Sequence, residues 1–171
     1  MKHFGKFLVV TLALGVLVGT AASVISTNPP PVTCRPVHGT IHSVFTTLNC
    51  TSPVGLCTAG TITDAGPLDG STTFAALAVA QSAGLPGEEP AANLSYSGRL
   101  TILAGHGTLV TRDLGILDAT HLAFTEMERP ESGTGVFANP GNSVFFISGS
   151  IVDNGQGFQG DLTGTVCAGA D

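Results

Sequence analysis

Apolar and polar residues alternate along most of the chain beyond residue 33. Val37, Ile41 and Phe45 fall on one side of an extended backbone, and His38 and His42 fall on the other. The same alternation recurs in residues 94–102, 145–151 and 158–167. Because successive side chains of a strand point to opposite faces, this period of two predicts strands with one buried face.

Turn signals separate these runs. Glycine-containing breaks occur at residues 105–107, 133–135, 140–142 and 154–157. Short strands with a turn about every ten residues are typical of antiparallel sandwiches and barrels. The pattern therefore predicts an all-β domain and leaves both architectures open.

Two segments need separate interpretation. Residues 74–83 are predicted to form a strand, but the alanines at 75, 76, 78 and 80 favour helix, so a helix of two or three turns is kept as the alternative. Residues 133–138 match the Gly-x-Gly-x-x-Ala dinucleotide fingerprint, but that motif works only between a strand and a helix. Pro140 follows almost at once and stops a long helix, so we predict an irregular turn or one short helical turn.

The start of the chain has the features of an export signal. Lys2 and Lys6 precede an uncharged run at residues 7–18, and small residues follow at 20–22. The apolar run is shorter than the about 20 residues that span a membrane. We predict a signal peptide at 1–22, a proline-rich linker at 23–33, the β domain at 34–167 and a tail at 168–171. The expected product is secreted or periplasmic and has no membrane span after cleavage.

Four cysteines in an exported chain indicate two disulfides rather than a metal site, since no Cys-x-x-Cys pair is present. Three connectivities are possible. We predict Cys50–Cys57, which closes a short loop, and Cys34–Cys167, which ties the start of the domain to its end.

Charge narrows the choice of partners. Without residues 1–22 the chain keeps four arginines and no lysine against its 12 carboxylates. This balance disfavours nucleic acids and anionic membranes as partners and excludes lysine-dependent chemistry. His38 and His42 have a metal-chelating spacing only on a helix; on a strand they lie about 13 Å apart. We expect no metal and no cofactor.

Glu126 is the catalytic candidate. It alternates with Leu122 and Phe124 and should share their apolar face, where burial would raise its pKa and suit it to proton transfer. Asp113 is a second candidate, although an aspartate that ends a strand commonly belongs to a turn or an ion pair. For both residues a purely structural role, or pairing of Glu126 with Arg112 or Arg129, is the competing interpretation.

The last third of the chain carries a family resemblance. Residues 133–138, 148–150, 157–160 and 162–166, together with the segment 50–60, resemble allene oxide cyclase-like and dirigent-like barrels and small exported bacterial proteins of that type. The resemblance implies a closed antiparallel barrel of about eight strands with an apolar cavity, in dimers or trimers. It also implies that substrates are cyclised or steered mainly by confinement, and it assigns no catalytic residue here.

The expected function is therefore binding of a small apolar molecule inside the barrel, as a carrier or as a cyclase or isomerase. The alternative is a structural or surface-interaction protein whose barrel is filled by its own side chains. A cavity containing Tyr96 or Glu126 favours binding. The predicted ligand-binding residues are aromatic: Phe45, Tyr96, Phe124, Phe145 and Phe158.

Overall fold

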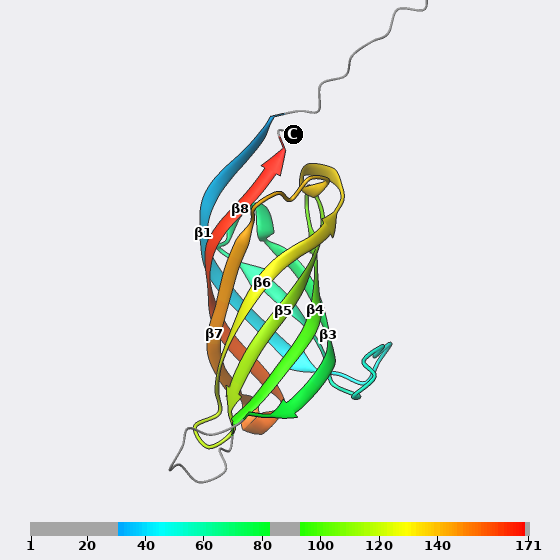
Figure 1. Ribbon diagram of the computed structural model, residues 1–171, viewed down its shortest axis with the longest axis vertical. Helices are drawn as coiled ribbons and strands as arrows, with labels where there is room; N and C mark the ends of the chain where they lie inside the picture. Colours follow the sequence, from blue (N-terminus) through cyan, green and yellow to red (C-terminus); the bar gives the residue numbers. More distant parts are fainter. Residues whose placement is uncertain (1–30, 83–92, 170–171) are drawn as a thin grey trace, which may run out of the picture.

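The computed structural model describes residues 31–82 and 93–169 of the 171-residue chain. Eight strands form one closed antiparallel barrel, in which each strand pairs with the next and β1 pairs with β8 (Figure 1). The predicted all-β barrel of about eight strands is confirmed. The strands are β1 (Val32–Phe45), β2 (Cys57–Thr63), β3 (Gly70–Gln81), β4 (Asn93–Ala104), β5 (Gly107–Asp118), β6 (Ala123–Gly133), β7 (Val144–Val152) and β8 (Gly157–Gly169).

The ends of the barrel lie close to the predicted domain limits. β1 begins at Val32 and β8 ends at Gly169, whereas the sequence predicted a domain from 34 to 167. The predicted signal peptide at 1–22 and most of the linker at 23–33 lie outside the described residues. Within the described residues, no helix is long and apolar enough to cross a membrane.

The alanine-rich segment is a strand, as predicted. β3 pairs with β2 on one side and β4 on the other, with a bulge between Ala76 and Ala78. Ladder hydrogen bonds to two neighbours outweigh the modest helix preference of alanine, because propensity is weak beside tertiary pairing.

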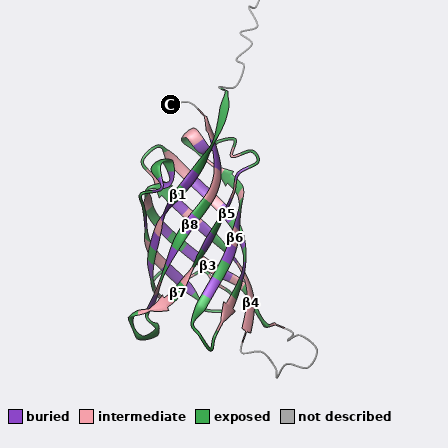
Figure 2. Ribbon diagram, turned by 90° about the vertical axis from the view of Figure 1, so that its left-hand side faces the viewer, coloured by how far each residue is buried: buried purple, intermediate pink, exposed green. Residues whose placement is uncertain are grey.

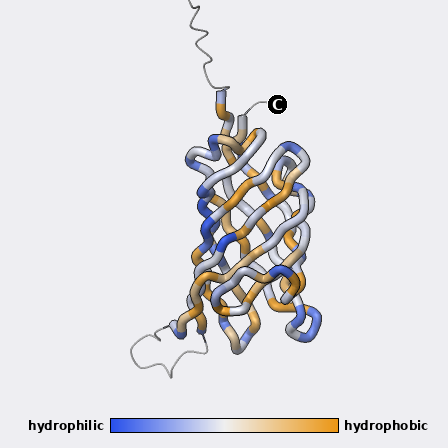
Figure 3. The backbone as a smooth tube through the Cα atoms, turned by 90° about the vertical axis from the view of Figure 1, so that its right-hand side faces the viewer, coloured by the Kyte–Doolittle hydropathy of each residue, from blue (hydrophilic) through white to orange (hydrophobic). Residues whose placement is uncertain are grey.

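Burial follows the predicted period of two. In β1 the side chains of Val37, Ile41 and Ser43 are buried, while His38 and His42 are exposed. Figure 2 shows the same banding of buried and exposed positions on the other strands, and Figure 3 shows the matching changes of hydropathy along the chain. The inward-facing residues of all eight strands therefore make up the core.

One end of the barrel is closed by two short 3₁₀ helices. η1 (Gly66–Leu68) and η2 (Gly135–Phe137) bury Leu68 and Phe137 completely. Gly135 has a positive φ of 59°, and a Cβ there would lie 2.1 Å from the carbonyl oxygen of His106. The fingerprint-like segment is therefore a tight turn that carries a hydrophobic plug, in agreement with the sequence prediction.

Both predicted disulfides are present. Cys34 and Cys167 face each other in the β1–β8 ladder and join its two strands near the closed end, where β1 begins and β8 ends (Figure 1). Cys50–Cys57 staples the loop between β1 and β2. Two disulfides indicate an oxidising setting, extracellular or periplasmic.

Candidate ligand-binding cavity and buried carboxyl cluster

An apolar cavity of about 170 Å³ lies inside the barrel and is partly open to solvent. Leu56 and Val79 are exposed and form part of its rim, whereas Phe74, Leu100 and Phe124 are buried along its walls. The complete lining is Phe45, Leu56, Thr58, Phe74, Val79, Leu94, Tyr96, Leu100, Leu117, Phe124, Glu126, Ile151 and Phe158. A cavity near 150 Å³ lined by apolar side chains can hold a benzene-sized molecule, so this one has room for a small ligand.

Four of the five aromatic residues predicted to bind a ligand line this cavity: Phe45, Tyr96, Phe124 and Phe158. The structure does not bring Phe145 to it. Phe145 is completely buried in β7, opposite Glu128. It faces inward like Ile147 but lies two residues closer to the start of β7, deeper in the barrel. Periodicity gives the face of a strand, but not the depth of a residue along the barrel axis.

The aromatic rings are arranged edge to face. Phe124 and Phe158 have ring centroids 5.2 Å apart at 80°, and Phe74 and Tyr96 have centroids 6.5 Å apart at 85°. Such pairs fix the ring orientations better than aliphatic contacts do. They give the cavity walls a defined shape.

Glycines make the space that the inward-facing polar residues occupy. A Cβ on Gly115 would lie 2.2 Å from Cζ of Tyr96, and one on Gly98 would lie 2.2 Å from a ring carbon of Phe74 and 2.8 Å from Oδ1 of Asp113. A larger residue at either position would displace the aromatic ring. The strand pattern alone does not distinguish these two glycines from the others in the chain.

Glu126 points into the barrel, as its alternation with Phe124 indicated, and is only 7% exposed. Leu122, which was expected to share that face, is instead an exposed turn residue with a φ of 56°. The strand begins only at Ala123, so the period of two does not extend back to Leu122. The expected alternative partners of Glu126, Arg112 and Arg129, are both exposed on the outer face, and Arg112 pairs there with Glu131.

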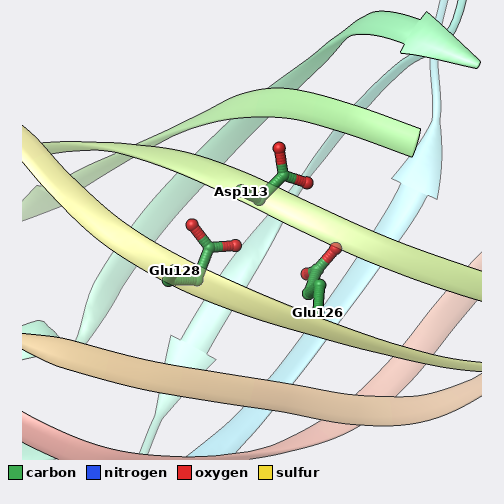
Figure 4. Close-up of side chains that lie close together, drawn as sticks. All are labelled: Asp113, Glu126 and Glu128. Atoms are coloured by element: carbon green, nitrogen blue, oxygen red, sulfur yellow. The ribbon is translucent and has the colours of Figure 1, made fainter. Parts of the chain in front are cut away.

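Asp113 and Glu128 lie beside Glu126, and both are completely buried (Figure 4). Asp113 was predicted to end a strand; it lies in the middle of β5, directly opposite Glu128 of β6. Oxygen atoms of the three carboxyl groups lie within 4.8 Å of one another. Glu128 was missed by sequence reasoning, although its spacing of two from Glu126 was the signal that could have found it.

The cluster has few hydrogen-bond donors. The Tyr96 hydroxyl donates to Oε2 of Glu126 at 2.8 Å, and the Thr111 hydroxyl donates to Oε2 of Glu128. The backbone N–H groups of Gly98 and Asp113 lower the pKa of the Asp113 carboxyl in part, but neither makes a well-aligned hydrogen bond to it. Oε1 of Glu128 has no partner. Two neighbouring carboxyl groups can hydrogen-bond only if one of them holds a proton.

Burial and mutual repulsion control the protonation of the cluster. Burial raises the pKa of Asp113 to about 6, and burial together with the charge of Asp113 raises the pKa of Glu126 to about 8. Burial, followed by the charges of Glu126 and Asp113, raises the pKa of Glu128 well above its usual range. Burial, followed by the charge of Glu126, also raises the pKa of Tyr96. Between pH 6 and pH 8, Asp113 is therefore mainly ionised while Glu126 still holds its proton.

No basic side chain compensates this charge within the described part of the barrel interior. All four arginines are exposed, and Arg99 and Arg112 both pair with Glu131 on the outer surface. His38 and His42, which the alternation places opposite the apolar face of their strand, are exposed too. The described interior therefore has three clustered carboxyl groups and no basic side chain.

The three carboxyl groups also raise the possibility of a metal. Their oxygens suit a hard cation, but Ca²⁺ takes six to eight oxygen ligands and Mg²⁺ takes six in near-octahedral geometry. The cluster offers three carboxyl groups, and the only hydroxyls bonded to it within the described residues are those of Tyr96 and Thr111. We interpret the cluster as a proton-holding group at the inner end of the cavity.

Comparisons with protein-family models, with curated proteins and with solved structures found no match to this chain. The fold and the cavity define it as a closed antiparallel β-barrel with an internal, mainly apolar cavity.

Proposed function

We propose that this protein binds a small, mainly apolar molecule in the barrel cavity. The observation that carries the proposal is the cavity of about 170 Å³, whose lining is aromatic and aliphatic except for Thr58, Tyr96 and Glu126. Ligand sites in proteins are typically concave and apolar with a few polar groups that orient the ligand, and this cavity has that composition.

The rival interpretation is a structural barrel filled by its own side chains. Filling occurs in the deeper half, where Ile102, Leu109 and Phe145 are completely buried. It does not extend to the half that contains Phe45, Phe124 and Phe158, which line the cavity. This difference between the two halves supports binding.

Binding is common to a carrier and to a cyclase or isomerase, and Glu126 is the residue that would separate them. A protonated carboxyl at the cavity wall can give its proton to a double bond or an oxygen of the ligand. It can then take a proton from a neighbouring carbon, which regenerates the acid and leaves an isomer. The hydrogen bond from Tyr96 would hold the carboxyl in place during both transfers.

Three further predictions from the sequence remain proposals. Membership of the allene oxide cyclase-like and dirigent-like barrels is supported only by motifs and by a barrel of the right strand number. Export through a signal peptide at 1–22 is supported by the disulfides, which form in oxidising compartments.

The third proposal is a dimer or trimer. Leu114 and Ile116 of β5 and Phe146 of β7 are exposed on the outer surface, and the cross-strand partner of both Leu114 and Phe146 is Met127. An exposed apolar patch of this kind supports self-association. Sedimentation analysis of the protein and of a Phe146→Ser variant measures it; a monomeric wild type would refute the proposal.

Substitution of a lining residue by a larger side chain fills the cavity and tests the binding proposal. Leu117→Trp places a large side chain into the lining, and Leu114→Trp makes the same change on the same strand but on the outer surface. NMR titration with 2-phenylethanol should show saturable shifts for the wild type and Leu114→Trp, and none for Leu117→Trp. Mass spectrometry of an organic extract of the protein from its native host would identify the natural ligand.

Absence of saturable binding to the wild type, or equal binding to both tryptophan variants, would refute the cavity as the site. If binding holds, incubation of the extracted ligand with wild type and with Glu126→Gln separates the two roles. A carrier returns the ligand unchanged in both cases, and a cyclase or isomerase converts it only when Glu126 is present.

A further inference from the structure

The inner end of the cavity has three neighbouring carboxyl groups, and the described interior has no basic side chain beside them. Asp113 is completely buried, and its carboxyl group lies next to those of Glu126 and Glu128. The inward-facing titratable groups around Glu126 are Tyr96 from β4, Asp113 from β5 and Glu128 from β6; β7 and β8 face it with Ile147 and Leu162. None of them is a cation.

We propose that the natural ligand is an apolar molecule with a protonated amine, and that its ammonium group binds Glu126 at the inner end of the cavity. This inference rests on the proposed function and deepens it by naming the ligand class. A buried carboxylate without a cation beside it is costly, and the ammonium group of a ligand can reach this cluster from the cavity through Glu126.

Access supports this assignment. Glu126 is the member of the cluster that lines the cavity, so an ammonium reaching its oxygens would lie beside the Asp113 carboxylate as well. Both oxygens of Asp113 and Oε1 of Glu128 lack a well-aligned donor, and an ammonium supplies three.

The walls also suit a cation. The rings of Phe74, Tyr96, Phe124 and Phe158 line the space through which the amine must pass. Aromatic faces attract ammonium groups, most strongly away from water. A carboxylate ligand would instead add a further negative charge to a site without a cation, so the same geometry excludes fatty acids and other anions.

Amine binding must be coupled to protons. An ammonium favours the ionised carboxyl groups, so at a pH where Glu126 holds a proton, binding releases it. Affinity then rises with pH by up to about tenfold per unit for each proton released, and levels off once the carboxyl groups ionise without ligand. An uncharged ligand of the same size gains no affinity as the pH rises.

Three probes with one ring and different head groups test the proposal: 2-phenylethylamine, 2-phenylethanol and phenylacetate. Calorimetry at pH 7 in two buffers with different heats of ionisation measures affinity and proton release together. We expect the amine to bind at least tenfold more tightly than the alcohol, phenylacetate to bind most weakly, and only the amine to release protons. Between pH 5.5 and 7.5 the affinity for the amine should rise.

Two variants and one control separate charge from shape. Glu126→Gln should keep binding of the alcohol and lose the preference for the amine. Asp113→Asn, which changes no lining residue, should reduce the affinity for the amine and flatten its pH profile. Glu131→Gln, on the outer surface, should change neither. Retained binding of the alcohol shows that each variant is folded, and Asp113→Asn serves alone if Glu126→Gln does not fold.

The outcomes are distinct. If the alcohol binds as well as the amine, or the amine binds without proton release, the inference is wrong and the cavity still stands as a binding site. If Ca²⁺ or Mn²⁺ stabilises the protein in a way that requires Asp113 and Glu126, and the amine has no effect, the amine proposal is wrong and the cluster is a metal centre. If no probe binds, the proposed function itself fails.

Discussion

Replacing Glu126 by glutamine should make the protein more stable at neutral pH. A folded chain whose Glu126 has a pKa of about 8 keeps a proton that the unfolded chain, with a glutamate pKa near 4.5, has already lost. Stability therefore falls as pH rises between these two values, by about 1.4 kcal/mol per pH unit for each such proton. Glutamine has the same shape and can still accept the hydrogen bond from Tyr96, but it has no proton to hold.

The size of the effect follows from the distance between the two pKa values. Wild type and Glu126→Gln should have nearly equal free energies of unfolding near pH 4.5, where Glu126 is protonated at little cost. At pH 7 the variant should be more stable by on the order of 3 kcal/mol. The neighbouring Asp113 and Glu128 add to the fall of wild-type stability with pH, because burial raises their pKa values too.

The assay is urea unfolding at half-unit steps from pH 4.5 to 8.5 with both disulfides intact. Glu131→Gln is the matched control, since Glu131 is an outer-surface carboxylate paired with arginines, and its curve should run parallel to that of the wild type. A carboxyl ¹³C titration of wild type should place the midpoint of Glu126 near 8. Wild-type stability that rises from pH 5 to 8, or a Glu126→Gln curve with the wild-type slope, would refute the reasoning.

Three other changes have defined consequences. Gly115→Ala should displace Tyr96 from Glu126 and lower the free energy of unfolding by about 1 to 3 kcal/mol. It should also raise the midpoint of the Glu126 titration, because the hydrogen bond from Tyr96 favours the ionised carboxyl; an unchanged midpoint and stability would show that the ring is not held there. Removing Cys34–Cys167 by paired alanine substitution should lower the free energy of unfolding by about 5 kcal/mol, and removing Cys50–Cys57 by about 2.5 kcal/mol, because the first disulfide closes the longer loop. Equal losses in urea unfolding would contradict this dependence on loop length. Phe137→Ala should remove the plug and cost about 3 to 5 kcal/mol while 2-phenylethanol still binds, and loss of that binding would mean that the two ends of the barrel are not independent.

The sequence by itself determined the local features of this protein. Alternation of apolar and polar residues assigned the inward faces of the strands, including Tyr96, Phe124 and Glu126, because the side-chain period of a strand is a local property. The even number of cysteines and their spacing were enough to choose the two disulfides that the structure contains. The turn at residues 133–138 could be recognised because strands, and not a helix, follow it.

Only the tertiary structure decided what lies at the same depth. Asp113 lies on β5 and both glutamates lie on β6, so the meeting of Asp113 with them depends on the β5–β6 register, which a bulge between Val110 and Thr111 shifts. The same dependence on depth put Phe145 in the filled half and Phe158 in the cavity. A period of two gives the side of a strand on which a residue lies, whereas pairing, bulges and closure of the barrel determine its neighbours.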